Sequence, residues 1–257
     1  MLAAFGAAEA DVRRLPGGEE VSVVAGDVVL KEVQDPTLSR WSQALLANAN
    51  PGPGFRIPEP IRSDEGHWDV DGWIATEFVD GLEPIRSDPA RVVTIGEDFC
   101  DVATDAYDGD EESIQQRQDR WARADRFVWD EEAIDLTAEA GDIASTLRAH
   151  MAVNRDPIAV VHGDLSGNVF VDPSGVPVVL DFSPFIRPKR YASAIVVADN
   201  LLWYDGERTL TNLIDHDDDG LARALLFRMA SEQLAPSPPY GAELDDYHRT
   251  LDSLGWA

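Results

Sequence analysis

The chain has 257 residues, of which 44% are hydrophobic, and its formal net charge at pH 7 is −27. This length and hydrophobic content suffice for one large domain or two modest lobes that share a cleft. The acidity excludes a nucleic-acid partner, because phosphate backbones are bound by Lys and Arg rather than by Asp and Glu.

Two further features of the composition bear on location. No apolar run approaches the ~20 residues needed to span a bilayer, so no membrane partner is expected. Cys100 is the only cysteine, which excludes an internal disulfide and favours a cytoplasmic location. Most of the acidity is interpreted as a solvated surface, and a cleft that attracts cationic amines is the alternative.

The first 80 residues predict a β-rich unit with one long helix. Gly26-Asp27 is a turn pair that suits a hairpin. Pro36 follows Asp35 at a favoured place for proline, the first turn of a helix. The expected elements are a short helix over 1–14, strands over 20–25 and 28–33, a helix that starts at 35 and ends before 50, and strands over 67–70 and 73–79.

Beyond residue 81 the pattern becomes mainly helical. Val92, Ile95, Phe99 and Val102 recur at helix spacing. The expected elements are helices over about 88–106, 136–151, 191–204 and 221–234, an exposed acidic loop over 107–113, two short strands around 160 and 180, and a turn over 183–190.

The two short strands near residues 160 and 180 carry the most informative residues of the chain. The first leads into His162-Gly163-Asp164-Leu165-Ser166-Gly167-Asn168, and the second ends in Asp181-Phe182-Ser183. An ordinary β-hairpin is the alternative interpretation, and it explains Gly167 and Asn168 as turn residues. It does not explain His162, or a second strand that ends in Asp-Phe at this distance.

This pair of motifs resembles those of the aminoglycoside phosphotransferases and related small-molecule kinases, a branch of the protein-kinase-like fold. Within that family it looks like the compact actinobacterial subgroup with His-Gly-Asp-Leu-x-Gly-Asn and Asp-Phe-Ser-Pro. The resemblance implies an α+β, bilobal, protein-kinase-like fold. A small β-rich N-lobe would span residues 1–80, and a larger helical C-lobe with the catalytic and metal-binding loops would span 81–257.

The resemblance assigns roles to four residues of these motifs. Asp164 is the expected catalytic base, which aims the acceptor hydroxyl and receives its proton. Asn168 and Asp181 are the expected Mg²⁺ ligands, and His162 is expected to support the loop structurally. The loop is one residue shorter than in the usual kinases, which puts the position of Asn168 in question; Gly167 would give the backbone freedom to re-aim it.

Lys31 ends the segment Val28-Val29-Leu30-Lys31, which resembles the strand whose lysine contacts the α- and β-phosphates of the nucleotide. A solvent-facing lysine at a strand end is the alternative. The usual partner is a Glu on the following helix, but residues 39–46 contain no acidic residue. Gln43 is the nearest polar substitute, so the ion pair is expected to be missing or supplied from elsewhere.

Two further segments complete the expected nucleotide-binding set, and a basic run is considered separately from it. Gly17 and Gly18 could form a turn over the phosphates, although a Pro-Gly-Gly turn is commonplace. Glu77 and Val79 lie in a segment that resembles the lobe connector of kinases, where a backbone C=O and N–H would hold adenine. The basic run 187–191 would either meet an acidic or phosphate-bearing substrate or pair internally, and internal pairing is favoured.

Together these residues predict an ATP- (or GTP-) and Mg²⁺-dependent phosphotransferase. Its expected partners are the nucleotide and a small-molecule acceptor, a hydroxyl of a small polar metabolite or of an aminoglycoside-like amine. The alternative is a nucleotide-binding pseudokinase that acts as a regulatory or binding module, because the helix Glu is absent and the loop is short. Phosphorylation of protein ranks last, since Ser166 stands where protein kinases place a lysine.

Overall fold

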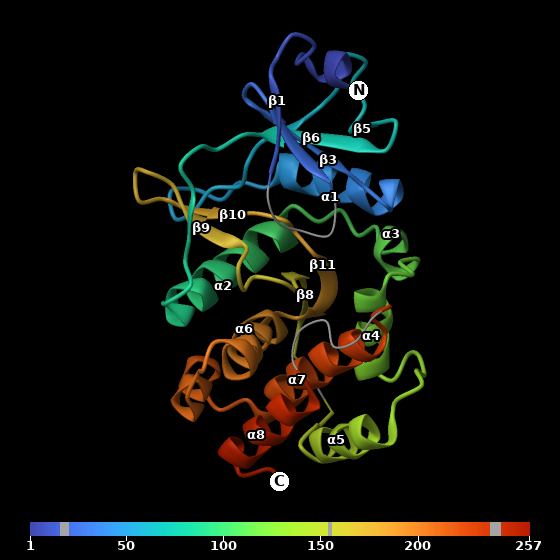
Figure 1. The fold of residues 1–257 in the computed structure, drawn as a ribbon, viewed down its shortest axis with the longest axis vertical. Helices are drawn as coiled ribbons and strands as arrows, with labels where there is room; N and C mark the ends of the chain where they lie inside the picture. Colours follow the sequence, from blue (N-terminus) through green and yellow to red (C-terminus); the bar gives the residue numbers. More distant parts are fainter. Residues whose placement is uncertain (16–20, 154–155, 237–242) are drawn as a thin grey trace.

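The computed structural model describes residues 1–15, 21–153, 156–236 and 243–257. Within these ranges an antiparallel sheet occupies one end of the molecule and a group of helices occupies the other (Figure 1). The N-terminus lies at the sheet end and the C-terminus at the helical end. This arrangement confirms the predicted α+β class. No helix in the described ranges is long and apolar enough to cross a membrane.

The N-terminal sheet has the strand order β1-β2-β3-β6-β4, and β5 also pairs with β6. Gly26, with φ of 62°, allows the tight predicted turn between β2 and β3. Leu30 and Ala75 lie opposite each other in the sheet and are fully buried. The strands are β1 (Val12–Arg14), β2 (Ser22–Ala25), β3 (Val28–Glu32), β4 (Pro60–Ile61), β5 (Asp69–Val70) and β6 (Trp73–Glu77).

The prediction of a helix over residues 1–14 is wrong. A short 3₁₀ helix, η1 (Leu2–Phe5), ends at Gly6, and the chain then extends into β1 at the edge of the sheet. Phe5 and Ala7 bury their side chains in the small core of the sheet. The apolar residues of this segment therefore reflect burial against the sheet rather than a helical stripe.

Helix α1 (Pro36–Asn48) confirms the predicted start at Asp35-Pro36. The Asp35 carboxylate accepts hydrogen bonds of 3.0 Å from the backbone N–H groups of Thr37 and Leu38, which satisfies two of the free donors of the first turn. Trp41 and Leu45 pack into the large core of the helical part. The helix therefore connects the sheet to the rest of the molecule.

The helical part is built around α6, whose residues from Tyr191 to Leu202 are all buried. The large core lies between α6 and the elements packed against it, chiefly α2, α7 and β8. The helices of this part are α2 (Pro89–Asp105), α3 (Glu112–Gln115), α4 (Arg120–Val128), α5 (Ala138–Ala149), α6 (Lys189–Trp203), η2 (Arg208–Ile214), α7 (Asp218–Gln233) and α8 (Leu244–Leu254).

Two small sheets lie between the N-terminal sheet and the helices (Figure 1). One has the order β10-β9-β7, and the other pairs β8 with β11. The prediction of a turn over residues 183–190 is wrong, because Pro184 to Pro188 pair as a strand with β8. Proline at both ends gives this strand the sequence of a turn, yet an edge strand tolerates it. These strands are β7 (Glu83–Pro84), β8 (Ile158–His162), β9 (Val169–Val171), β10 (Pro177–Val179) and β11 (Pro184–Pro188).

Arg56 joins the N-terminal sheet to the β9–β10 hairpin. Its backbone N–H donates to Pro177 O at 2.8 Å, and its carbonyl accepts from Val179 N–H at 3.0 Å. Its side chain donates to Glu77 at the end of β6, at 2.5 Å. One residue thus bonds to both parts of the molecule.

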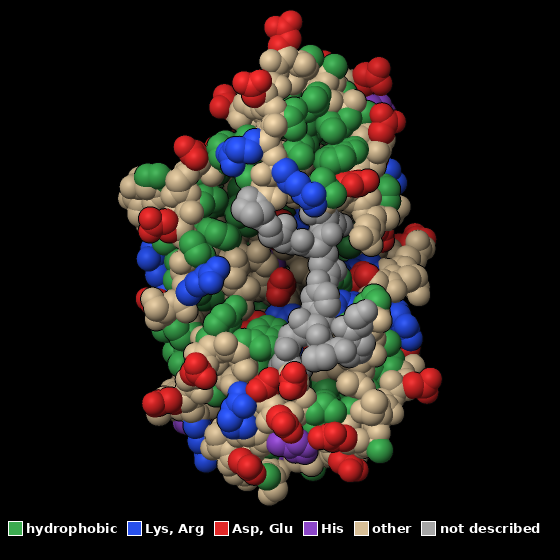
Figure 2. Space-filling view, in the orientation of Figure 1, with side chains coloured by type: hydrophobic (Ala, Val, Ile, Leu, Met, Phe, Trp, Pro, Cys, Tyr) green, Lys and Arg blue, Asp and Glu red, His purple; other side chains and the backbone are tan. Residues whose placement is uncertain are grey.

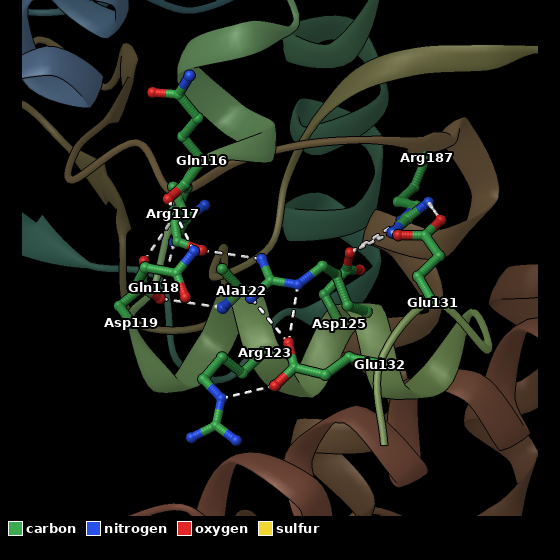
Figure 3. Close-up of polar contacts among 11 residues, drawn as sticks. Gln116, Arg117, Gln118, Asp119, Ala122, Arg123, Asp125, Glu131, Glu132 and Arg187 are labelled. Carbon is green, nitrogen blue, oxygen red and sulfur yellow. Dashed lines mark hydrogen bonds and ion pairs between the residues drawn. The ribbon is translucent and has the colours of Figure 1, made fainter. Parts of the chain in front are cut away.

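Charged pairs hold β11 and α6 against the surrounding helices. Arg187 bonds to Asp125 at 2.6 Å and to Glu131 at 2.8 Å, as Figure 3 shows. Lys189 bonds to Asp101 at 2.6 Å. The basic run therefore pairs internally, as predicted.

Candidate active site

The loop between β8 and β9, residues 163–168, is called the catalytic loop after the role predicted for Asp164. It lies next to the segment 180–183 that follows β10. The N–H of Gly163 donates to Ser183 O at 2.8 Å, and the N–H of Leu180 donates to Asn168 O at 2.9 Å. Backbone hydrogen bonds at both ends therefore fix the catalytic loop against the segment that carries Asp181.

His162 lies fully buried at the start of the catalytic loop. Its Nδ1 accepts from the N–H of Asp164 at 3.1 Å, so its Nε2 carries the proton and donates to Leu180 O at 3.0 Å. The rings of Phe99 and Phe182 contact it edge-on, with centroids 5.6 Å away. His162 thus ties together the two loops, which supports the structural role predicted for it.

Burial lowers the pKa of His162 below its ordinary value of 6.5, so the ring is neutral in the folded protein. As pH falls below about 6.5 the unfolded chain takes up a proton that the folded protein does not bind. His162 therefore stabilises the fold fully above that pH and progressively less below it, by at most about 1.4 kcal/mol per pH unit. In urea unfolding between pH 7.5 and 5, the stability difference between wild type and His162→Gln is expected to shrink on acidification. A constant difference would contradict a neutral, buried His162.

Gly163 stands where protein kinases have an arginine. The position of the Phe185 ring explains why a glycine occupies this place. A Cβ at Gly163 would lie against the Phe185 ring, 2.6 Å from its Cδ2. Carbon atoms pack at about 3.5–4.0 Å, so even an alanine would force the loop or the ring to move. The guanidinium of Arg117 covers the same ring, 4.8 Å from its centroid.

Asp164 and Asn168 contact each other directly despite the short loop. The amide Nδ2 of Asn168 donates to Asp164 O at 2.7 Å and to Asp164 Oδ2 at 3.0 Å. Gly167 makes this possible, because its φ of 85° lies in the left-handed region that favours glycine. No described donor bonds to the Asn168 Oδ1, which is the atom that a metal ion would need.

Lys31 and Asp181 form an ion pair of 3.1 Å, which brings a residue of β3 against the segment after β10. Asp181 has φ of 47°, an uncommon conformation for a residue other than glycine. Gln43, the predicted substitute for the helix Glu, is buried and its Oε1 has no partner among the described residues. The carboxylate partner that helix α1 lacks is therefore supplied by Asp181.

The predicted adenine-binding segment follows directly from β6. The N–H of Phe78 donates a hydrogen bond to Asp27 O at 2.8 Å, whereas no described residue accepts a hydrogen bond from the N–H of Val79. The side chain of Glu77 faces Arg56 and the N–H of Glu59. The N–H of Val79 could therefore donate a hydrogen bond to adenine.

Gly17 and Gly18, the predicted phosphate-covering turn, lie outside the residues that the structure describes. Figure 2 shows a hollow between the sheet end and the helical end of the molecule, with both acidic and basic side chains around it.

The oxygen donors present fit Mg²⁺. Within the described ranges no group of three or more His, Cys, Asp or Glu side chains is placed to hold a metal. Asn168 and Asp181 nevertheless offer an amide oxygen and a carboxylate from adjacent loops. Mg²⁺ is usually held by one or two protein groups together with phosphate and water, so a donor pair of this kind suffices when a nucleotide is bound.

Two charged residues of this site were not predicted from the sequence, Asp199 on α6 and Arg228 on α7. Arg228 donates to Asp164 Oδ1 at 3.0 Å and to both oxygens of Asp199 at 2.7 Å. Burial opposes the charge on Arg228, but the carboxylates of Asp199 and Asp164 outweigh it and raise the pKa of Arg228 above its ordinary value. Each of them is a single charged residue within an otherwise uncharged, mainly apolar run, 194–202 for Asp199 and 224–230 for Arg228, and this pattern could have indicated a buried functional charge.

Two other features do not belong to this site. Burial raises the pKa of the Cys100 thiol to about 12, so this cysteine is not a nucleophile near neutral pH. A cavity of about 270 Å³ lies beside α3, α4 and β11, and its lining includes Arg117, Asp125 and Arg187 but no residue of the catalytic loop. The charged side chains of this region pair with one another, as Figure 3 shows.

Solved structures of several kinases share the fold of this chain. A choline/ethanolamine kinase family protein from Mesorhizobium loti matches with a TM-score of 0.57 and 15% identity, over 99% of this chain and 90% of that chain. An aminoglycoside phosphotransferase from Alicyclobacillus acidocaldarius matches with a TM-score of 0.57 and 17% identity, over 99% and 93%. The fold is that of these kinases. Choline kinase LicA from Streptococcus pneumoniae also matches, with a TM-score of 0.57 and 13% identity over 96% and 94%, and LicA has also been solved in complex with AMP.

These likenesses confirm the predicted protein-kinase-like fold. No protein-family model and no curated protein matches the sequence. The division into lobes at residues 80 and 81, like the roles of the individual site residues, stays a prediction.

Proposed function

We propose that this protein is an ATP- (or GTP-) and Mg²⁺-dependent phosphotransferase that acts on a hydroxyl group of a small, polar, amine-bearing metabolite. One observation carries the proposal: the residues assigned to the base, the metal and the phosphates converge on two hydrogen-bonded loops. Asn168 bonds to Asp164, and Lys31 bonds to Asp181. A nucleotide with Mg²⁺ and an acceptor hydroxyl need this set of groups in one place.

In this mechanism Asp164 accepts the hydrogen bond of the acceptor hydroxyl, aims it at the γ-phosphate and receives its proton. Lys31 would bind the α- and β-phosphates in place of its present partner Asp181. Asn168 and Asp181 would hold Mg²⁺, which neutralises charge that develops on the phosphate oxygens. The backbone of Glu77 and Val79 would bind adenine at the end of β6.

The class of acceptor is supported by two observations. The solved structures with this fold include a choline kinase and an aminoglycoside phosphotransferase, and both choline and aminoglycosides carry a cationic nitrogen and a hydroxyl. This chain has a net charge of −27. Such a field attracts a cationic acceptor.

The test is nucleotide turnover with ATP or GTP across a panel of amino alcohols and amino sugars, each with and without Mg²⁺. ADP or GDP release is expected to depend on both an acceptor and Mg²⁺, and mass spectrometry should find the phosphorylated acceptor. Absence of turnover with every acceptor at millimolar concentration would contradict the proposal.

A nucleotide-binding pseudokinase is the second candidate, and two departures from the kinase pattern favour it. Helix α1 carries no acidic residue to pair with Lys31, and the loop from Asp164 to Asn168 is one residue shorter than in the usual kinases. A thermal shift separates the two candidates. Stabilisation by ATP that requires Mg²⁺, without turnover on any acceptor, would favour the pseudokinase; no stabilisation would count against both.

A further inference from the structure

Arg228 is a buried cation that contacts the proposed catalytic base from a distant part of the chain. It lies on α7, 64 residues after Asp164, and its side chain is 5% exposed. The guanidinium is packed beside the rings of Trp203 and Phe227, 5.2 and 5.4 Å from their centroids. Neither the motifs of the catalytic loop nor the nucleotide-binding residues include it.

The orientation of this guanidinium is fixed by Asp199. Nε donates to Asp199 Oδ1 and Nη2 to Asp199 Oδ2, both at 2.7 Å, and the Asp199 side chain is fully buried. A guanidinium is planar and its N–H groups form a rigid fork, so a two-point contact with a carboxylate determines the direction of the remaining donors. Nη2 then reaches Asp164 Oδ1 at 3.0 Å.

Asp164 is consequently held at both of its carboxylate oxygens by donors from different elements. Arg228 bonds to Oδ1, and Asn168 bonds to Oδ2 at 3.0 Å. Each oxygen keeps a further lone pair for the acceptor hydroxyl. With two donors fixed by the fold, the carboxylate plane has a single orientation, and misplacement of a reacting group by about 1 Å can lower a rate about 100-fold.

We infer that Arg228 is the positioning residue of the active site: anchored by Asp199, it aims the Asp164 carboxylate at the acceptor hydroxyl. This inference rests on the proposed phosphotransferase function and adds to it a third element, α7, which the motifs do not contain. Through the pair Asp199–Arg228, the packing of α6 against α7 would determine the orientation of the Asp164 carboxylate.

Removal of Arg228 by itself would leave Asp199 buried without a partner, and the variant could fail to fold. The decisive variant therefore replaces both charges, Arg228→Met together with Asp199→Val, because apolar replacement of a buried ion pair is often neutral for stability. A matched control is Arg223→Met, which removes another buried arginine of α7 that bonds to Asp219 and not to the catalytic loop. Circular dichroism and thermal unfolding check that each variant is folded.

The expected result is a fall in kcat of about 10- to 100-fold in the double variant, with the nucleotide KM and the ATP-induced thermal shift unchanged. Arg228→Lys, which keeps the charge but not the fork, is expected to retain part of kcat. Arg223→Met is expected to keep the wild-type kcat per folded molecule. In an Asp164→Asn background the double replacement is expected to cause no further loss.

Three outcomes would contradict these claims, two of them the role of Arg228 and one the proposed function itself. A folded double variant with wild-type kcat would overturn the role of Arg228 while leaving the phosphotransferase proposal intact. A loss of kcat of equal size in Arg223→Met would also overturn it, since the effect would then be a general consequence of losing a buried arginine. Absence of turnover by the wild type with every acceptor would overturn the proposed function, and with it this inference.

Discussion

Replacement of Asp164 by Asn is expected to lower kcat by about 100- to 10,000-fold, the range that a positioned general base contributes. The amide has the shape of the carboxylate but cannot receive the acceptor's proton. It also meets donors on both sides, from Asn168 and Arg228. One of these contacts is lost because an amide has only one acceptor atom. Steady-state kinetics at saturating acceptor measures the effect.

Nucleotide binding should survive this substitution, since the described contacts of Asp164 do not include Lys31, Glu77 or Val79. The thermal shift with ATP and Mg²⁺ is therefore expected to match that of the wild type. Asp71→Asn is the matched control: Asp71 is exposed in a turn with φ of 53°, a conformation that asparagine adopts readily. Equal turnover by Asp164→Asn and wild type would remove Asp164 from the mechanism.

Replacement of Asp199 by Ala is expected to lower the free energy of unfolding by about 3–5 kcal/mol, the usual result of breaking a buried ion pair. The side chain of Asp199 is fully buried and accepts both short hydrogen bonds from Arg228, whose own side chain is 5% exposed. Without Asp199 the guanidinium keeps only Asp164 as a hydrogen-bond partner in the described part of the chain. Urea unfolding at pH 7 measures the change.

Asp101→Ala provides the control for this measurement. Asp101 also pairs with a basic residue of α6, Lys189, but its side chain is 66% exposed. Surface pairs contribute about 0–1 kcal/mol, so Asp101→Ala is expected to change stability by less than about 1 kcal/mol. A loss in Asp199→Ala no larger than that would show that the buried pair does not stabilise the fold.

The sequence predicts the parts of this site that depend on local patterns. His162, Asp164 and Asn168 lie at the end of β8 and in the loop that follows it, so their spacing specifies most of their geometry. The hairpin at Gly26 and the start of α1 at Asp35 follow from turn and capping chemistry in the same way.

What the sequence does not predict depends on how distant elements pack. The contact between Arg228 and Asp164 exists only because α7 packs against α6 beneath the catalytic loop. Lys31 and Asp181 are 150 residues apart in the sequence, and their contact requires the N-terminal sheet to lie against the segment 180–183. Strand β11 was mistaken for a turn because its two prolines are common to turns and edge strands alike.

Arg56 has a consequence for how the two ends of the molecule can move apart. Its backbone is bonded to the β9–β10 hairpin and its side chain to Glu77, so the connection on that flank is short and continuous. Any movement of the N-terminal sheet away from the hairpin would therefore have to break the hydrogen bonds of Arg56 on one side or the other.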